Sequence, residues 1–73
     1  MRNEDKHHYA QLEELQMRIA DCAVAIGHLE RKRRRSLYRD HFLDADQYEA
    51  EIAEEQHKMK MLERSYELIK QQK

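Results

Sequence analysis

The sequence predicts an all-α protein, folded as an antiparallel two-helix hairpin of the coiled-coil type. The 73 residues contain no proline and a single glycine, Gly27, so residues that interrupt helices are scarce. Glu, Lys, Arg, Gln, Leu, Met and Ala, which all favour helices, fill most positions. Apolar residues recur at intervals of three and four along two long stretches, and this pattern is typical of helices that pack along a narrow seam.

The first helix is predicted over about residues 4–38. Its seam is a regular series of apolar residues at the a and d positions of a heptad pattern. The series consists of Leu12, Leu15, Ile19, Cys22, Ile26 and Leu29. No glycine follows the last turn, so the end of this helix is only weakly marked.

The turn is predicted at about residues 39–44 and the second helix at about residues 45–71. Asp44 is expected to cap this helix, because its carboxylate can accept amide hydrogens that the first turn leaves unpaired. Gln47, three residues further on, completes a capping-box pattern, and Leu43 with Tyr48 fits a hydrophobic staple. A single domain, residues 1–73, therefore accounts for the whole chain.

A second seam follows the second helix and is interrupted by one acid, Glu55. Its members are Tyr48, Ile52, Glu55, Met59, Leu62, Tyr66 and Ile69. A reversal near residues 42–43 predicts these apolar contacts across the hairpin: Leu15 with Ile69, Ile19 with Tyr66, Cys22 with Leu62, Ile26 with Met59, and Leu37 with Tyr48. Arg33 on the first seam is expected within reach of Glu55, where a polar pair can fix the register.

Several apolar or small residues lie off both seams, and these are the candidate partner-binding residues. They are Met17, Ala20, Val24 and Gly27 in the first helix and Ala53, His57, Met61 and Leu68 in the second, with Ala23 and Ala50 beside them. A solvated hairpin has no need of such residues, and methionine adapts to irregular surfaces. We therefore interpret them as a docking face for a partner protein or a second copy. The alternative is that they are helix-forming filler.

The small size of the chain predicts association. Two helices bury little apolar surface, and chains of this length usually need a disulfide, a metal or a partner. Cys22 is the single cysteine, which excludes an intramolecular disulfide and fits a reducing compartment. No apolar run reaches the ~20 residues of a transmembrane helix, and the polar N-terminus does not resemble a signal peptide. We expect a cytoplasmic protein, stabilised by a partner or by dimerisation, that does not insert into membranes.

The histidines and acids form no pattern typical of a metal or catalytic site. His7 and His8 are adjacent, so they point about 100° apart on a helix, and the other three histidines are separated by many turns. No His or Cys pair has the spacing of converging metal ligands. Two exposed helices also offer no water-excluding pocket in which catalysis could occur. We expect a non-enzymatic protein with no cofactor and no bound metal.

A basic run extends from Arg31 to Arg35 and is followed by Arg39. Taken alone, it favours a phosphate-binding tip for nucleic acid or lipid headgroups. Six acids are expected opposite these six bases: Asp44, Asp46, Glu49, Glu51, Glu54 and Glu55. We therefore favour internal neutralisation, which weakens the field that a phosphate would feel, and the formal net charge of −1 argues the same way.

The segment Phe42-Leu43-Asp44-Ala45-Asp46-Gln47-Tyr48 resembles the small helical-hairpin co-chaperones of type III secretion needle subunits. The apolar residues Leu62, Tyr66 and Ile69 are similar to the stripe that this family carries in its second helix. The resemblance implies a cytosolic partner of a repeat-helix chaperone, which together with it keeps a needle subunit soluble before export. It also implies that Tyr48 stabilises the turn and that the outer stripe meets the chaperone.

Two interpretations from other functional classes stay open. One is a structural hairpin that associates with itself into a four-helix bundle. The other is a small nucleic-acid-binding regulator that uses the tip from Arg31 to Arg35. The mass of the chain in solution tests the first, and salt-dependent binding to unrelated DNA tests the second.

Overall fold

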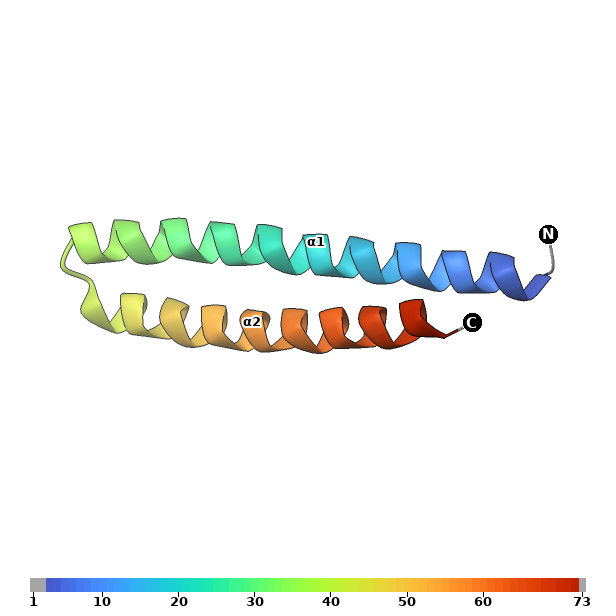
Figure 1. Cartoon of the computed structure of the whole chain (residues 1–73). Coiled ribbons are helices and arrows are strands. Elements are labelled where there is room, and N and C mark those ends of the chain that lie inside the picture. The colour runs from blue at the N-terminus through green and yellow to red at the C-terminus, as the bar shows by residue number, and fades with distance from the viewer. Residues whose placement is uncertain (1–2, 73) are drawn as a thin grey trace.

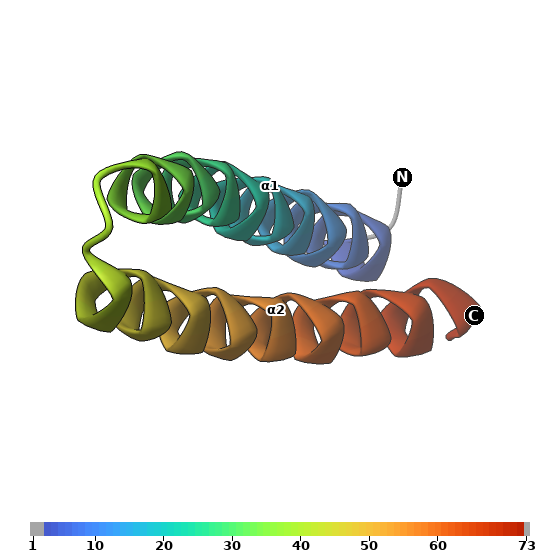
Figure 2. The ribbon, with the colours of Figure 1, turned by 90° about the vertical axis from the view of Figure 1, so that its left-hand side faces the viewer.

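The computed structural model describes residues 3–72, with the side chains of residues 7–72. It consists of two helices, α1 (Asn3–Tyr38) and α2 (Phe42–Gln71), joined by residues 39–41. The helices run antiparallel and lie side by side in both views (Figures 1 and 2), and α1 extends past the end of α2. The rod measures 57 × 15 × 11 Å between Cα atoms. The predicted helical hairpin is confirmed.

The core of the hairpin lies along the two predicted seams, and Ala45, which was not predicted as a member, extends the second seam toward the turn. Four apolar side chains of the described part are buried, Cys22 and Ile26 from α1 and Ala45 and Ile52 from α2. The other apolar seam residues are half-buried: Leu12, Leu15, Ile19, Leu29, Tyr48, Met59, Leu62, Tyr66 and Ile69. The heptad assignment is therefore confirmed. A core this small gives the isolated hairpin little hydrophobic stabilisation.

Helix α1 ends in a Schellman motif in which an aspartate takes the position usually held by glycine. The amide of His41 donates to the carbonyl of Ser36 at 2.8 Å, and the amide of Asp40 donates to the carbonyl of Leu37 at 3.1 Å. These two bonds satisfy carbonyl groups that the last helical turn leaves unpaired. Asp40 has a φ of 59°, a left-handed conformation that glycine adopts freely and aspartate tolerates better than most residues.

Helix α2 begins about one turn before the predicted position, and Asp44 is not its cap. The N-cap residue is His41, whose side chain makes no capping hydrogen bond. Asp44 lies within the first turn, where its Oδ2 atom is 4.0 Å from Nδ1 of His41. Leu43 is 86% exposed, so it forms no staple with Tyr48. The predicted cap, capping box and staple are wrong, because His41 both closes the Schellman motif and starts α2.

The early turn also shifts the register of the two helices by about one helical turn. Nε2 of Gln16 donates a hydrogen bond to the hydroxyl of Tyr66 at 3.0 Å, and Arg33 lies 4.0 Å from Glu49. Tyr66 is therefore level with Gln16 instead of with Ile19. The predicted faces of the helices are nevertheless correct, because each seam still packs against the other.

Near the turn, Ser36 lies on the seam, whereas Leu37, which was predicted to contact Tyr48, does not. Ser36 is half-buried, whereas Leu37 is exposed. The hairpin has two edges, which are the two sides on which the groove between the helices opens, and Leu37 lies on the opposite edge from Tyr48. The predicted contact between Leu37 and Tyr48 is wrong, because the three-residue step from Arg33 leads to Ser36. Ala45, the most buried seam residue at 3% exposure, is also small. Small side chains therefore occupy both seams next to the turn.

The two polar residues of the seams do not pair with each other as predicted. Arg33 pairs with Glu49, whereas Glu55 pairs with Lys58 of its own helix at 3.4 Å. The shifted register explains the change of partner, since it brings Glu49 level with Arg33. Both ion pairs are partly exposed, so each contributes roughly 0–1 kcal/mol to stability.

Candidate protein-interaction surfaces

The candidate residues of α1 lie on the side of the helix that faces away from α2. Val24 is two positions from both Cys22 and Ile26, which are buried, and this places it about 160–200° around the helix from them. Met17 and Val24 share one face because they are seven residues apart, and they are 65% and 59% exposed. We call the four candidates the α1 outer stripe: Met17, Ala20, Val24 and Gly27.

Gly27 has no evident role in the packing of the hairpin. A Cβ atom built at this position would meet nothing within 4 Å. Its φ is not positive, so its backbone conformation does not require glycine either. A glycine inside a helix costs roughly 0.5–1 kcal/mol relative to alanine. The hairpin thus carries a destabilising residue that neither its backbone nor its core requires.

The candidate residues of α2 lie along the outer side of the second helix. Met61 and Leu68 share one face, and they are 53% and 59% exposed. His57 and Met61 border a depression on one edge of the hairpin, whereas Ala53 borders a depression on the other edge. We call these residues the α2 outer stripe: Ala53, His57, Met61 and Leu68. The stripes lie on opposite sides of the seam, so the predicted docking face is two separate surfaces.

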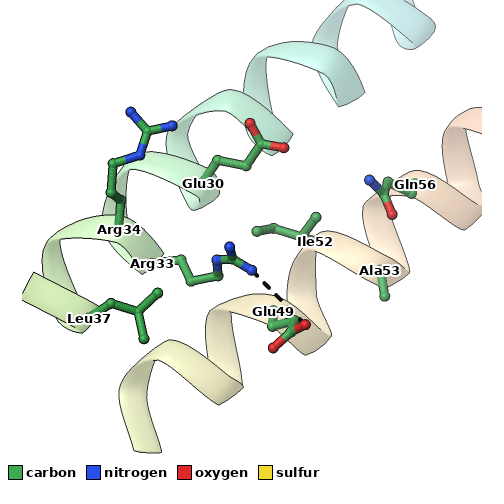
Figure 3. A pocket seen from close by; sticks show the side chains of 8 residues that line it. All are labelled: Glu30, Arg33, Arg34, Leu37, Glu49, Ile52, Ala53 and Gln56. Carbon is green, nitrogen blue, oxygen red and sulfur yellow. Dashed lines mark ion pairs between the residues drawn. The ribbon is translucent and has the colours of Figure 1, made fainter. Parts of the chain in front are cut away.

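One edge of the hairpin holds a shallow depression of about 510 Å³ near the turn (Figure 3). Arg33 extends toward Glu49, at 4.0 Å, beside the buried side chain of Ile52. The guanidinium of Arg34 points away from α2 (Figure 3). Charged groups from both helices line this edge, so it does not offer a continuous apolar surface.

The other edge holds an open depression of about 620 Å³ with Cys22 and Leu62 among its lining residues. Charged side chains also surround this depression, among them Arg18 and Lys58. Desolvation by burial raises the pKa of the Cys22 thiol above its ordinary value, and the nearby carboxylate of Glu55 adds to the shift. A raised pKa keeps the thiol protonated at neutral pH, so Cys22 behaves as a small apolar seam residue.

A third apolar surface, the apolar tip, lies at the turn and was not predicted from the sequence. It consists of Tyr38, Phe42 and Leu43, of which Tyr38 is 91% exposed. The assignment of Leu43 to a hydrophobic staple concealed it, because a staple would have covered that side chain. Its three residues lie outside both heptad seams, and this is the sequence signal that could have identified the tip.

The basic cluster is less neutralised than predicted. Of its six bases, Arg33 alone takes part in an ion pair among the described side chains. The remaining members are exposed: Arg31, Lys32, Arg34, Arg35 and Arg39. The acids of α2 still lie on the neighbouring helix, so they reduce the field without pairing with individual arginines.

The described residues bring no three His, Cys, Asp or Glu side chains together in a way that could hold a metal ion. Neither helix, over the part that the structure describes, is long and apolar enough to cross a bilayer. What the described surfaces offer is exposed apolar area, on the outer side of each helix and at the tip.

Comparisons of the chain with protein-family models, with curated proteins and with solved structures give no match.

Proposed function

We propose that this protein is a non-enzymatic interaction module that binds other proteins through the outer sides of its two helices. The observation that carries the proposal is an apolar stripe on each helix, directed away from the seam. The large side chains of the two stripes are Met17 and Val24 on α1 and Met61 and Leu68 on α2, and all four are more than half exposed. Aligned apolar side chains that a monomer leaves exposed are typical of binding surfaces.

The small core supports the same proposal. Four of the side chains that the structure describes are buried, so a partner that binds the folded state adds stability that this small core does not supply. Two helices packed along a seam also present their outer residues at a regular spacing, which suits recognition by another helical surface.

In its more specific form, the proposal makes this chain a cytoplasmic co-chaperone of a secretion apparatus. Its partners would be a repeat-helix chaperone and a needle subunit that the two keep soluble, and the α2 outer stripe would meet the chaperone. The support is the segment from Phe42 to Tyr48 and the position of its tyrosine. Tyr48 is half-buried and lies near Ser36 and Arg39 beside the turn, where the resemblance expects it to act.

The test is to capture partners of the tagged full chain in its native host and to reconstitute binding from purified components. The double substitution Met61→Glu and Leu68→Glu is expected to abolish this binding while helicity, measured by circular dichroism, is retained. The physical reason is that both side chains project away from the seam. Calorimetry with the purified partner measures the loss.

The matched control is Glu63→Lys with Glu67→Lys, which changes two exposed residues of the same helix outside the stripe. The control is expected to bind as the unchanged chain does. Unaltered binding by the Met61→Glu and Leu68→Glu variant would refute the role of the α2 outer stripe. A reconstituted partner other than a chaperone would refute only the more specific proposal.

A further inference from the structure

We propose that the α1 outer stripe binds the same stripe of a second copy of this chain, with the two α1 helices antiparallel. The inference rests on the proposed function, because it assigns a partner to one of the two outer stripes. It leaves the α2 outer stripe available for a different protein. The stripe continues by one charged residue at each end, and its members are then Glu13, Met17, Ala20, Val24, Gly27 and Arg31.

The spacing of this extended stripe is the same when it is read from either end. Its steps are four, three, four, three and four residues. An antiparallel copy therefore brings every member level with another member, as the layers of an antiparallel coiled coil do. The layers are Glu13 with Arg31, Met17 with Gly27, and Ala20 with Val24. Each layer occurs twice about a two-fold axis, so the contact closes as a dimer.

Each apolar layer joins a large side chain to a small one. Met17 lies over Gly27 of the second copy, and Val24 lies over Ala20 of the second copy. The small residues let the two backbones approach and leave room for the large side chain opposite. This arrangement gives Gly27 a role, although a Cβ atom there would meet nothing within the single hairpin.

The charges at the ends of the stripe select the antiparallel orientation. Glu13 and Arg31 are exposed, and neither takes part in an ion pair among the described side chains. An antiparallel dimer places them opposite each other at both ends, whereas a parallel dimer would oppose like charges. Tyr9, which is 62% exposed, falls level with Arg35 of the second copy, and a guanidinium is favourable beside an aromatic ring.

The edges of the hairpin are less suited to self-association. A four-helix bundle would pack two hairpins together through one of these surfaces, to which both helices contribute, but charged side chains such as Arg18 and Glu49 line them. Contact through the α1 outer stripe instead gives a layer of four helices, with the two α1 helices in the middle. This layer leaves both α2 outer stripes accessible.

Charge reversal tests the antiparallel layers directly. Glu13→Arg leaves two bases facing two bases in the dimer, and Arg31→Glu leaves acids facing acids. Each variant alone is expected to weaken dimerisation about tenfold at low salt. An equimolar mixture of the two variants is expected to restore it, because one chain then presents two bases to the two acids of the other. Sedimentation equilibrium, starting from the 9.0 kDa chain, measures the masses.

The matched controls are Lys60→Glu and Glu67→Arg, which make the same charge changes on α2 and should leave dimerisation unchanged. A wild-type mass of 9.0 kDa at concentrations up to about 1 mM would overturn the inference. So would a dimer that neither reversal weakens, or a mixture that does not recover. None of these results bears on binding of a foreign partner, which the Met61→Glu and Leu68→Glu variant tests separately.

Gly27→Met provides an independent test that separates folding from association. The hairpin is expected to become more stable, since the new side chain has free space and favours the helix more than glycine does. Dimerisation is expected to weaken at least tenfold, because Met17 of the second copy loses the space above Gly27. Unchanged dimerisation together with a raised melting temperature would refute the layer of Met17 with Gly27.

Discussion

Asp40 is the residue at which the chain leaves α1, and it adopts a backbone conformation that glycine reaches at lower cost. Its φ is 59°, and the amide groups that close the motif come from the backbone. Asp40→Gly is therefore expected to keep both hydrogen bonds and to raise the free energy of unfolding by about 0.5–1 kcal/mol. Urea denaturation followed by circular dichroism measures the change.

Asp40→Ala is the control, because alanine removes the carboxylate without relieving the left-handed conformation. It is expected to lower the stability, since aspartate tolerates this conformation better than alanine does. Equal stability of the glycine and alanine variants would contradict the Schellman motif at this turn.

Cys22 provides a second prediction about a single residue. Burial and the Glu55 carboxylate raise the pKa of the thiol, and the thiolate is the reactive form. Native Cys22 is therefore expected to react more slowly with a thiol reagent at pH 8 than the same chain does in urea. The absorbance of the released chromophore follows the reaction. Equal rates in the native and denatured chains would show that the seam does not protect the thiol.

The same shift has a consequence for stability. The pKa of the folded state lies above the ordinary value of 9.0, so the unfolded chain loses its thiol proton first as pH rises. The contribution of this group to stability is thus fully present below about pH 9 and is lost as pH rises through the folded pKa. Replacement of Cys22 by alanine is expected to remove this part of the pH dependence.

The start of α2 illustrates how one element depends on the end of another. Asp44 acts through the helix dipole instead of as a cap, so Asp44→Ala is expected to cost only about 0.3–1 kcal/mol. Ala45 is 3% exposed between the helices, and Ala45→Leu is expected to cost about 1–3 kcal/mol because the backbones must separate. Thermal melts compare the two variants. A loss of stability for Asp44→Ala above its expected range would restore the capping role predicted from the sequence.

The two helices and their buried faces could be predicted from the sequence, because a heptad pattern records which side of a helix is covered. The position of the turn could not. The motif at Asp40 lacks the glycine that usually marks it, whereas Asp44 and Gln47 form a capping pattern that the structure does not use. This error of about one turn shifted every predicted pairing of residues between the two helices, including the partners of Arg33 and Tyr66.

The candidate surfaces were predicted as residues but not as an arrangement. The heptad pattern identifies four large residues as outer residues because they do not occupy its seam positions: Met17, Val24, Met61 and Leu68. Whether they form one face or two depends on how the helices are placed about their common seam, and the structure separates them into two stripes. The apolar tip was missed for a different reason, since its exposure follows from the early start of α2.

At the scale of the whole molecule, the distribution of charge decides whether the basic cluster can bind nucleic acid. Most of its arginines are exposed and take part in no ion pair among the described side chains, but the acids from Asp44 to Glu55 lie along the neighbouring helix, and their charge opposes the field of the bases. Binding to duplex DNA at physiological salt is therefore expected to be undetectable or weak. Fluorescence anisotropy across a salt series measures it. Micromolar affinity that falls steeply with salt would favour the nucleic-acid-binding alternative.

The rod shape of the hairpin has a hydrodynamic consequence. A particle whose Cα atoms extend over 57 Å in length and 15 Å in width diffuses more slowly than a sphere of equal mass, so a single chain elutes from a sizing column ahead of compact standards. Length separates the possible assemblies better than elution does. The two-fold axis of the proposed dimer passes near the middle of α1, so pairing broadens the rod and leaves its length, 57 Å between Cα atoms, nearly unchanged. Pairing through the apolar tip would nearly double that dimension in small-angle scattering.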